Sequence, residues 1–210
     1  MRIYLVRHGE TDWNKMGRFQ GSTDIPLNQY GIELAEITSE GLKEVPFDII
    51  YTSPLVRAQK TAEIMRRDRQ IEIITDDRLK EMSFGVFEGA DIRLVREQKE
   101  HGLYTLLNAP EKYRAEGGEN FEEVIARCRS FIQETLLSAE VNYENVMISA
   151  HGGLIRCFLR CIENRPIADF WKGIPQGNCA VTVIEMQNGK IQILEEGKLY
   201  YHKEHVGILG

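Results

Sequence analysis

The sequence has little cysteine, no surplus of basic residues and no long hydrophobic run. Four cysteines occur among its 210 residues, and none of them forms a C-x-x-C pair. This spacing disfavours both a disulfide framework and a cysteine-based metal site. We therefore expect buried, reduced thiols and a reducing compartment.

The remaining absences exclude further classes of protein. The formal net charge of −6 argues against a nucleic-acid partner, because such proteins usually present a basic face. No window approaches the roughly 20 apolar residues of a membrane helix. The apolar run at residues 3–6 is too short for a secretory signal. We expect a cytoplasmic protein without nucleic-acid or membrane partners.

The chain length favours one domain, at about 150 residues per domain. The composition, 42% hydrophobic and 28% charged, is ordinary for a globular protein. The sequence shows neither a long linker nor a low-complexity tract. We predict one domain over residues 1–210, with a possible homodimer left open.

Short apolar runs alternate with amphipathic helical patterns, which predicts an α/β fold. Strands are expected at 3–6, 48–51, 71–74 and 145–149, and the last run has the continuous apolar character of a central parallel strand. The segments 180–186 and 190–196 flank Asn188-Gly189, which suits a two-residue hairpin turn.

Helical stripes lie between these runs. Ser53-Pro54 has the character of an N-cap followed by proline at the first helical position. Further stripes cover 121–136 and 154–162, and a less regular one lies near 90–101. The predicted fold is a three-layer sandwich: a mostly parallel central sheet, helices on both faces and a C-terminal β-hairpin. Residues 82–118 are interpreted as a lid-like insertion.

Two phrases have the same outline: LVRHGETDWN at 5–14 and VMISAHGGL at 146–154. In each, an apolar run ends in His-Gly, at His8 and at His151. Ligands of open α/β sheets bind beyond the carboxyl ends of parallel strands, so the two histidines are expected to converge there.

Two arginines accompany the histidine pair. Arg7 adjoins His8, and Arg57 lies in the first turn of the helix expected after Ser53-Pro54. A helix N-terminus favours an anion, and the planar guanidinium suits phosphate. Each residue alone is more often a structural or solvated group; together they predict a phosphate pocket.

The phrase LVRHGETDWN resembles the signature of the histidine phosphatase superfamily, also called phosphoglycerate mutase-like. Further blocks are similar to the family in the same order: GRFQGSTDIPLNQYG at 17–31, YTSPLVRAQKTAE at 51–63, RLKEMSFGVFEG at 78–89, GGEN at 117–120 and ISAHGG at 148–153. The resemblance spans nearly the whole chain, and the block after residue 80 is similar to the phosphatase subtype.

The resemblance implies a phosphohistidine mechanism. His8 corresponds to the nucleophile, and a backbone carbonyl just after it holds one ring nitrogen. Arg7, Arg57 and His151 correspond to the phosphate clamp. Glu81 corresponds to the general acid and base, a role that requires a carboxyl pKa nearer to neutral. The positions that correspond to other pocket-lining residues are Asn14, Gln20, Gly21 and Gly152.

The same resemblance implies no cofactor and no metal site, since the arginines supply the positive charge. Of the other histidines, His202 and His205 are interpreted as part of a solvated tail rather than as metal ligands. Asn120 departs from the family, which often has serine after GGE, and this departure is expected to affect specificity at most.

Three functions are compared. A metal-independent phosphatase of small phosphomonoesters is favoured. A cofactor-dependent phosphoglycerate mutase is the alternative; it needs additional basic residues in the pocket, and the adjacent pair Arg66-Arg67 is expected to be solvated instead. A non-catalytic binder of a phosphorylated ligand ranks last, because all five expected catalytic residues are present. The aromatic and apolar residues of the insertion either form the pocket mouth or pack the insertion onto the core: Phe84, Phe87, Leu103, Tyr104 and Tyr113.

Overall fold

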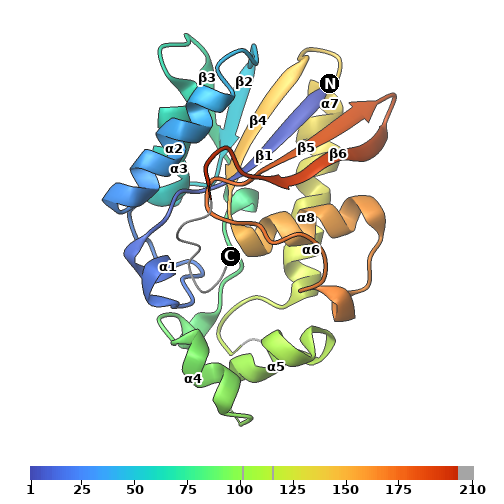
Figure 1. Cartoon of the computed structure of the whole chain (residues 1–210). Coiled ribbons are helices and arrows are strands. Elements are labelled where there is room, and N and C mark those ends of the chain that lie inside the picture. Colours follow the sequence, from blue (N-terminus) through green and yellow to red (C-terminus); the bar gives the residue numbers. More distant parts are fainter. Residues whose placement is uncertain (101, 115, 203–210) are drawn as a thin grey trace.

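A six-stranded sheet forms the centre of the computed structural model, which describes residues 1–100, 102–114 and 116–202 (Figure 1). The strand order is β3-β2-β4-β1-β5-β6. The first four strands in this order are parallel, whereas β5 is antiparallel to β1 and to β6. The strands are β1 (Arg2–Arg7), β2 (Ile49–Thr52), β3 (Glu72–Thr75), β4 (Asn145–Ala150), β5 (Val181–Gln187) and β6 (Lys190–Lys198). The predicted strands and the C-terminal hairpin are confirmed.

Helices cover both faces of the sheet (Figure 1). Along β1, Ile3 and Leu5 join one buried apolar cluster, and Tyr4 and Val6 join another on the opposite face. The first cluster includes residues of α6 (Phe121–Phe131) and α8 (Gly152–Glu163). The second includes residues of α2 (Gln29–Gly41) and α3 (Val56–Arg66). The expected three-layer sandwich is therefore confirmed.

The remaining helical elements are short. They are α1 (Asp12–Met16), α4 (Ile92–Glu97), α5 (Gly102–Asn108), α7 (Leu137–Ala139), a π-helical stretch between α6 and α7 (Ile132–Leu136), and the single turns Asp77–Leu79, Gly85–Phe87, Pro110–Lys112 and Ile167–Asp169. α4 and α5 lie beyond the carboxyl ends of the parallel strands (Figure 1). No helix in the described part of the chain is both long enough and apolar enough to cross a bilayer.

Two predicted helices differ from the structure. The helix expected at Ser53-Pro54 begins at Val56, with Leu55 at the N-cap position. Ser53 does not cap it; its Oγ atom accepts from the Leu55 N–H at 3.3 Å and contacts His151 instead. The helix expected at 90–101 is shorter, since α4 begins at Ile92 and ends at Glu97. The Asp91 side chain caps its start by accepting from the Arg93 N–H at 2.9 Å.

The helices α1, α2 and α5 were not predicted. The first two begin at a side-chain cap: the Thr11 hydroxyl accepts from the Asn14 N–H before α1, and the Asn28 side chain accepts from the Gly31 N–H before α2. α2 has five buried residues, Gly31, Leu34, Ala35, Thr38 and Ser39. Four of these are small or polar, so the hydrophobic periodicity of α2 is weak in the sequence.

Candidate active site

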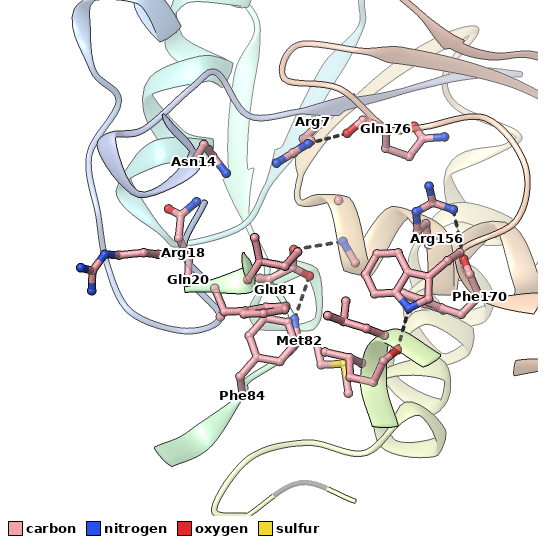
Figure 2. A pocket seen from close by; sticks show the side chains of 18 of the residues that line it. Arg7, Asn14, Arg18, Gln20, Glu81, Met82, Phe84, Arg156, Phe170 and Gln176 are labelled. Atoms are coloured by element: carbon pink, nitrogen blue, oxygen red, sulfur yellow. Dashed lines mark hydrogen bonds between the residues drawn. The ribbon is translucent and has the colours of Figure 1, made fainter. Parts of the chain in front are cut away.

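A cavity of ≈ 450 Å³ lies where β1 and β4 end (Figure 2). Its lining includes Arg7 and His8 from the end of β1, Gly152 and Gly153 from the start of α8, and Glu81. We call the buried group of Arg7, His8, Arg57 and His151 the floor of the site. His151 and Arg57 are completely buried, with 0% exposure, and do not line the cavity themselves.

The two predicted histidines lie together. Their ring centroids are 5.1 Å apart, and the ring planes are inclined by 58°. The His8 N–H donates to the Ala150 carbonyl, at the carboxyl end of β4, which fixes the backbone of His8 against the neighbouring parallel strand. The convergence expected from the parallel pairing is thus present.

One ring nitrogen of each histidine has a protein partner. His8 Nδ1 lies 2.7 Å from the Gly9 carbonyl oxygen. Because a carbonyl can only accept, Nδ1 carries the proton and the unprotonated Nε2 is free to act as a nucleophile. His151 Nε2 lies 2.8 Å from Ser53 Oγ. The Ser53 hydroxyl can donate there, in which case the proton of the ring is on Nδ1.

The arginine side chains are held by backbone carbonyls. Arg7 donates to the Gln176 carbonyl at 2.6 Å, and Arg57 donates to the carbonyls of Thr23 and Gly21 at 2.8 and 2.7 Å. No acidic side chain pairs with either guanidinium within the described residues. Two fixed positive charges therefore remain uncompensated by direct contact.

Three buried nitrogens of the floor have no hydrogen-bond partner in the described part of the chain: Arg7 Nε, Arg57 Nε and His151 Nδ1. An unpaired buried donor costs about 1–3 kcal/mol, so such groups call for a functional explanation. An anion that accepts from all three would satisfy them. The floor therefore has the donor set of an oxyanion site.

The helix N-terminus expected beside the phosphate has another role. The Val56 N–H, at the start of α3, donates to Asp24 Oδ1 at 2.8 Å. The expectation that this helix end binds the phosphate is wrong, because the Asp24 carboxylate already occupies it. Arg57 still reaches the floor from the first turn of α3.

Electrostatics keep both imidazoles neutral. Burial, followed by the positive charges of Arg57 and Arg7, lowers the pKa of His8 well below its ordinary value. Burial and the charge of Arg57 act on His151 in the same way and lower its pKa well below the ordinary value. Burial also lowers the pKa of Arg57 to about 10, which leaves its guanidinium charged at neutral pH.

Glu81 lies at the N-terminus of α8, on the side of the cavity next to Met82 (Figure 2). Its carboxylate accepts from the N–H groups of Gly153 at 3.0 Å, Leu154 at 2.8 Å and Met82 at 2.9 Å. The first two are free donors of the first helical turn, which stabilise an anion. A Cβ at Gly153 would lie 2.8 Å from Glu81 Oε1, so only glycine admits this close approach.

The amides expected in the pocket are oriented by acceptor contacts. Asn14 Oδ1 accepts from the Thr11 N–H and from Asn178 Nδ2, both at 3.2 Å. Gln20 Oε1 accepts from the Thr11 hydroxyl at 3.0 Å. Their amide nitrogens are thereby turned away from these partners, and both residues line the cavity together with Gly21 and Gly152. Thr11 and Asn178 had no signal in the sequence.

The loop after His8 is packed directly against α2. A Cβ at Gly9 would lie 2.4 Å from the Gly31 carbonyl oxygen, and a Cβ at Gly31 would lie 2.1 Å from the Glu10 carbonyl oxygen. Neither position has room for a side chain. The Gly9 N–H also donates to Thr61 Oγ1 at 3.0 Å, so α3 holds the same loop.

The outer part of the cavity, which we call the mouth, is largely apolar. It is formed by the side chains of Phe19, Phe84, Ile92, Leu106, Leu107, Phe170 and Trp171, with Arg18, Arg96 and Arg156 among them. Of the five insertion residues considered from the sequence, Phe84 lines the cavity, whereas Leu103 and Tyr113 are buried in the core. The Trp171 indole N–H donates to the Leu106 carbonyl at 2.6 Å and ties the segment after α8 to α5.

The arginines of the mouth correct one expectation. No sequence pattern placed an arginine pair in the pocket, because Arg18, Arg96 and Arg156 are far apart in the chain. Only Arg18 lies in a block that resembles the family. Arg66-Arg67, in contrast, behaves as expected: Arg67 is exposed at the end of α3 and pairs with Glu40 at 2.7 Å.

Asn120 does not line the cavity, and it precedes α6 as its N-cap residue. Asparagine and serine are about equally favourable there, which accounts for the departure from the family without a change in the pocket. No group of three or more His, Cys, Asp or Glu side chains suited to a metal ion occurs among the described residues. His202 is exposed, and His101 and His205 lie outside the described residues. All four cysteines are unpaired.

Comparison with known proteins agrees with the fold. The family model of the histidine phosphatase superfamily, branch 1, matches residues 3–197. The sequence is 32% identical to "Putative phosphoserine phosphatase 2" of Hydrogenobacter thermophilus, over 97% of this chain and 98% of that protein. It is 31% identical to "Probable phosphoglycerate mutase GpmB" of Proteus mirabilis, over 90% of this chain and 86% of that protein.

Among solved structures, Bacillus stearothermophilus YhfR superposes with a TM-score of 0.87 at 32% identity, over 94% of this chain and 97% of that chain. The fold class is therefore that of the phosphoglycerate mutase-like proteins. The chain belongs to the histidine phosphatase superfamily, branch 1.

Proposed function

We propose that this protein hydrolyses small phosphomonoesters through a phosphohistidine on His8, with Glu81 as general acid and base and without a metal ion. That it is a phosphoric monoester hydrolase follows from its family and its phosphoserine phosphatase relative. The covalent route and the residue roles go beyond that membership. The observation that supports them is the floor: a neutral histidine with a free Nε2, surrounded by unpaired buried donors.

In the first step, the lone pair of His8 Nε2 forms a bond to phosphorus, and the bond between phosphorus and the ester oxygen breaks. The proton of Glu81 passes to the departing oxygen, so the product is a neutral alcohol. His8 Nδ1–H stays bonded to Gly9 and stabilises the positive charge on the phosphorylated ring. Arg7, Arg57 and His151 stabilise the charge on the other phosphoryl oxygens.

In the second step, a water molecule attacks the phosphorus of phosphohistidine while the Glu81 carboxylate takes its proton. The bond between phosphorus and Nε2 breaks, inorganic phosphate leaves, and Glu81 is protonated again. Three N–H groups contact the carboxyl oxygens of Glu81 and hold this group in place for the proton transfer.

Phosphoglycerate mutase activity is the second candidate, and two observations favour it. Relatives named as mutases match most of the chain, and Arg18, Arg96 and Arg156 around the mouth could hold a second anionic group of a substrate. The two activities share the first step. They differ in whether water or a second hydroxyl takes the phosphoryl group.

The test is to incubate the protein with 4-nitrophenyl phosphate in an excess of chelator. We expect phosphate release that the chelator does not lower and that His8→Ala abolishes. Loss of activity in the chelator, or retention in His8→Ala, would contradict the mechanism. Incubation with 3-phosphoglycerate and its bisphosphate primer is the matched experiment: rapid formation of the 2-isomer would favour the mutase.

A further inference from the structure

The backbone that carries Glu81 has no regular structure of its own. Residues 80–84 lie between the turns Asp77–Leu79 and Gly85–Phe87 and belong to neither a helix nor a strand. A general acid must nevertheless meet the leaving oxygen within hydrogen-bond distance, and an error of about 1 Å can cost on the order of 10²-fold in rate. Contacts from elsewhere must therefore fix this segment.

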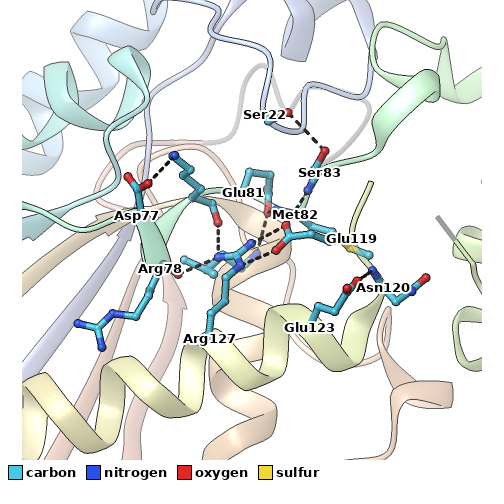
Figure 3. A network of polar contacts seen from close by, with 12 residues as sticks. Ser22, Asp77, Arg78, Glu81, Met82, Ser83, Glu119, Asn120, Glu123 and Arg127 are labelled. Atoms are coloured by element: carbon cyan, nitrogen blue, oxygen red, sulfur yellow. Dashed lines mark hydrogen bonds and ion pairs between the residues drawn. The ribbon is translucent and has the colours of Figure 1, made fainter. Parts of the chain in front are cut away.

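Arg127, on α6, holds the part of the segment that precedes Glu81 (Figure 3). Its NH1 atom donates to the carbonyl oxygens of Arg78 and Lys80, both at 2.7 Å. Lys80 immediately precedes Glu81, and Arg78 lies two residues before that. The Arg127 side chain is only 16% exposed, so water competes little for these contacts.

Glu119 holds the part of the segment that follows Glu81 (Figure 3). Its Oε2 atom accepts from the Ser83 N–H at 3.0 Å, and its own N–H donates to the Ser83 carbonyl at 2.9 Å. Ser83 lies two residues after Glu81. The chain on both sides of Glu81 is thereby fixed.

The two holding residues are joined to each other. Arg127 Nε donates to Glu119 Oε1 at 2.8 Å, and Arg127 NH2 donates to Oε2 at 3.0 Å, which is the bidentate geometry of a strong ion pair. We propose, on the basis of the function proposed above, that this Arg127–Glu119 ion pair is a positioning device that sets the placement of the Glu81 carboxyl group for proton transfer. Neither side chain lines the cavity.

The ion pair is one of two attachments that connect Glu81 to the helices α6 and α8. The Glu81 carboxylate is bonded to the first turn of α8, and its backbone is bonded to α6 through Arg127. α6 and α8 pack against each other in the same buried cluster, through residues such as Val124 and Phe158. The acid is thus fixed at both ends to one rigid pair of helices, and removing the ion pair frees only the backbone end.

A series of phenyl phosphates separates this role from general stabilisation. All members have a similar shape, but a nitro-substituted phenol leaves without protonation, whereas a methoxy-substituted phenol needs the general acid. For Arg127→Gln we expect kcat/KM to fall about 10- to 30-fold with 4-methoxyphenyl phosphate and no more than about twofold with 4-nitrophenyl phosphate. Glu119→Gln, which keeps an oxygen near Ser83, should show the same pattern with a smaller loss.

Controls define the comparison. Arg129→Gln changes an exposed arginine of the same helix and should leave the whole series unchanged. Arg127→Lys keeps the charge without the planar fork and should give an intermediate loss. In the Glu81→Gln background, Arg127→Gln should produce no further loss, because residues that act as one unit are not additive. Thermal melting of each variant shows that it is folded.

A uniform loss across the series, or an additive loss in the Glu81→Gln background, would overturn the proposal and assign the ion pair to stability alone. If Arg127→Gln does not fold, Glu119→Gln and Arg127→Lys decide by the same criteria. If Glu81→Gln itself leaves the dependence on the leaving group as in the wild type, the fault lies in the proposed role of Glu81. The two failures are therefore distinguishable.

Discussion

The floor and the mouth of the cavity are built on different principles. In the floor, the four side chains are at most 6% exposed, and each is held by a backbone atom or a buried hydroxyl. In the mouth, Arg18 and Arg96 are exposed, Trp171 is 39% exposed, and the supporting helices α4 and α5 have six and seven residues. The difference indicates that the floor is held by the sheet and the elements packed against it, whereas the mouth depends on short helices at the surface.

The largest effect is expected in the floor. Arg57→Gln removes a buried charge that the proposal assigns to the phosphoryl oxygens, and we expect kcat/KM for 4-nitrophenyl phosphate to fall about 10³-fold. Arg18→Gln, its counterpart in the mouth, should cost about threefold at most, because an exposed arginine is well solvated. Steady-state kinetics of both variants measure the contrast, and equal losses would remove the distinction between floor and mouth.

The floor should also make stability depend on pH. The pKa values of His8 and His151 are lowered in the folded state, so below about pH 6.5 the unfolded chain binds protons that the folded chain does not. The unfolding free energy should therefore decrease as the pH falls, by about 1.4 kcal/mol per pH unit for each histidine until its folded-state pKa is reached.

Denaturant unfolding between pH 7.5 and pH 5.5 measures this slope, with His151→Gln as the comparison. The variant lacks one of the two buried groups and should lose stability about half as steeply. An unchanged slope in His151→Gln would show that other groups cause the pH dependence. The mouth has no buried titratable histidine among its described residues, so variants there should leave the slope unchanged.

A smaller effect is expected at Ser53, which contacts the floor through His151. Ser53→Ala removes the partner of His151 Nε2, so the imidazole is no longer held in the tautomer with the proton on Nδ1. We expect kcat to fall about tenfold with little change in KM, because His151 then donates less reliably to the phosphoryl group. Ser53→Thr keeps the hydroxyl and should restore most of kcat; failure to do so would contradict a role through the tautomer.

The smallest effect should come from the mouth. Trp171→Phe removes the hydrogen bond to the Leu106 carbonyl and loosens the contact between the segment after α8 and α5. We expect KM to rise about two- to fivefold with kcat unchanged, since remote contacts contribute to binding more than to the chemical step. A comparable fall in kcat would mean that the mouth takes part in the chemistry, which would contradict the distinction between floor and mouth.

The same contrast explains what could be predicted from the sequence. The strands and the convergence of His8 with His151 follow from short apolar runs and parallel pairing, which are local signals. Trp171 and Gln176 were not found, because they lie in a segment without periodicity after α8 and reach the cavity only through the tertiary fold. Arg156 lies on the predicted helix α8, but its apolar stripe does not show that this arginine faces the cavity. The N-terminus of α3 was wrongly assigned to the phosphate because nothing local shows that Asp24 occupies it.

The contacts that orient these residues could not be predicted from the sequence either. Thr11 and Asn178 orient Asn14 from opposite ends of the chain, separated from it by 3 and 164 positions. The contacts of Arg127 with the Arg78 and Lys80 carbonyls join α6 to a segment nearly fifty positions earlier in the chain. Sequence patterns identify groups that carry chemistry, whereas the partners that orient those groups are set by packing between distant segments.

The contact between Gly9 and Gly31 couples two positions that lie 22 residues apart. Backbone meets backbone there, so enlarging either residue pushes α2 away from the loop that follows His8, and no neighbouring side chain can shrink to make room. The first turn of α2 therefore determines the path of that loop. In any redesign of this enzyme, Gly9 and Gly31 should be changed only together, along with the first turn of α2.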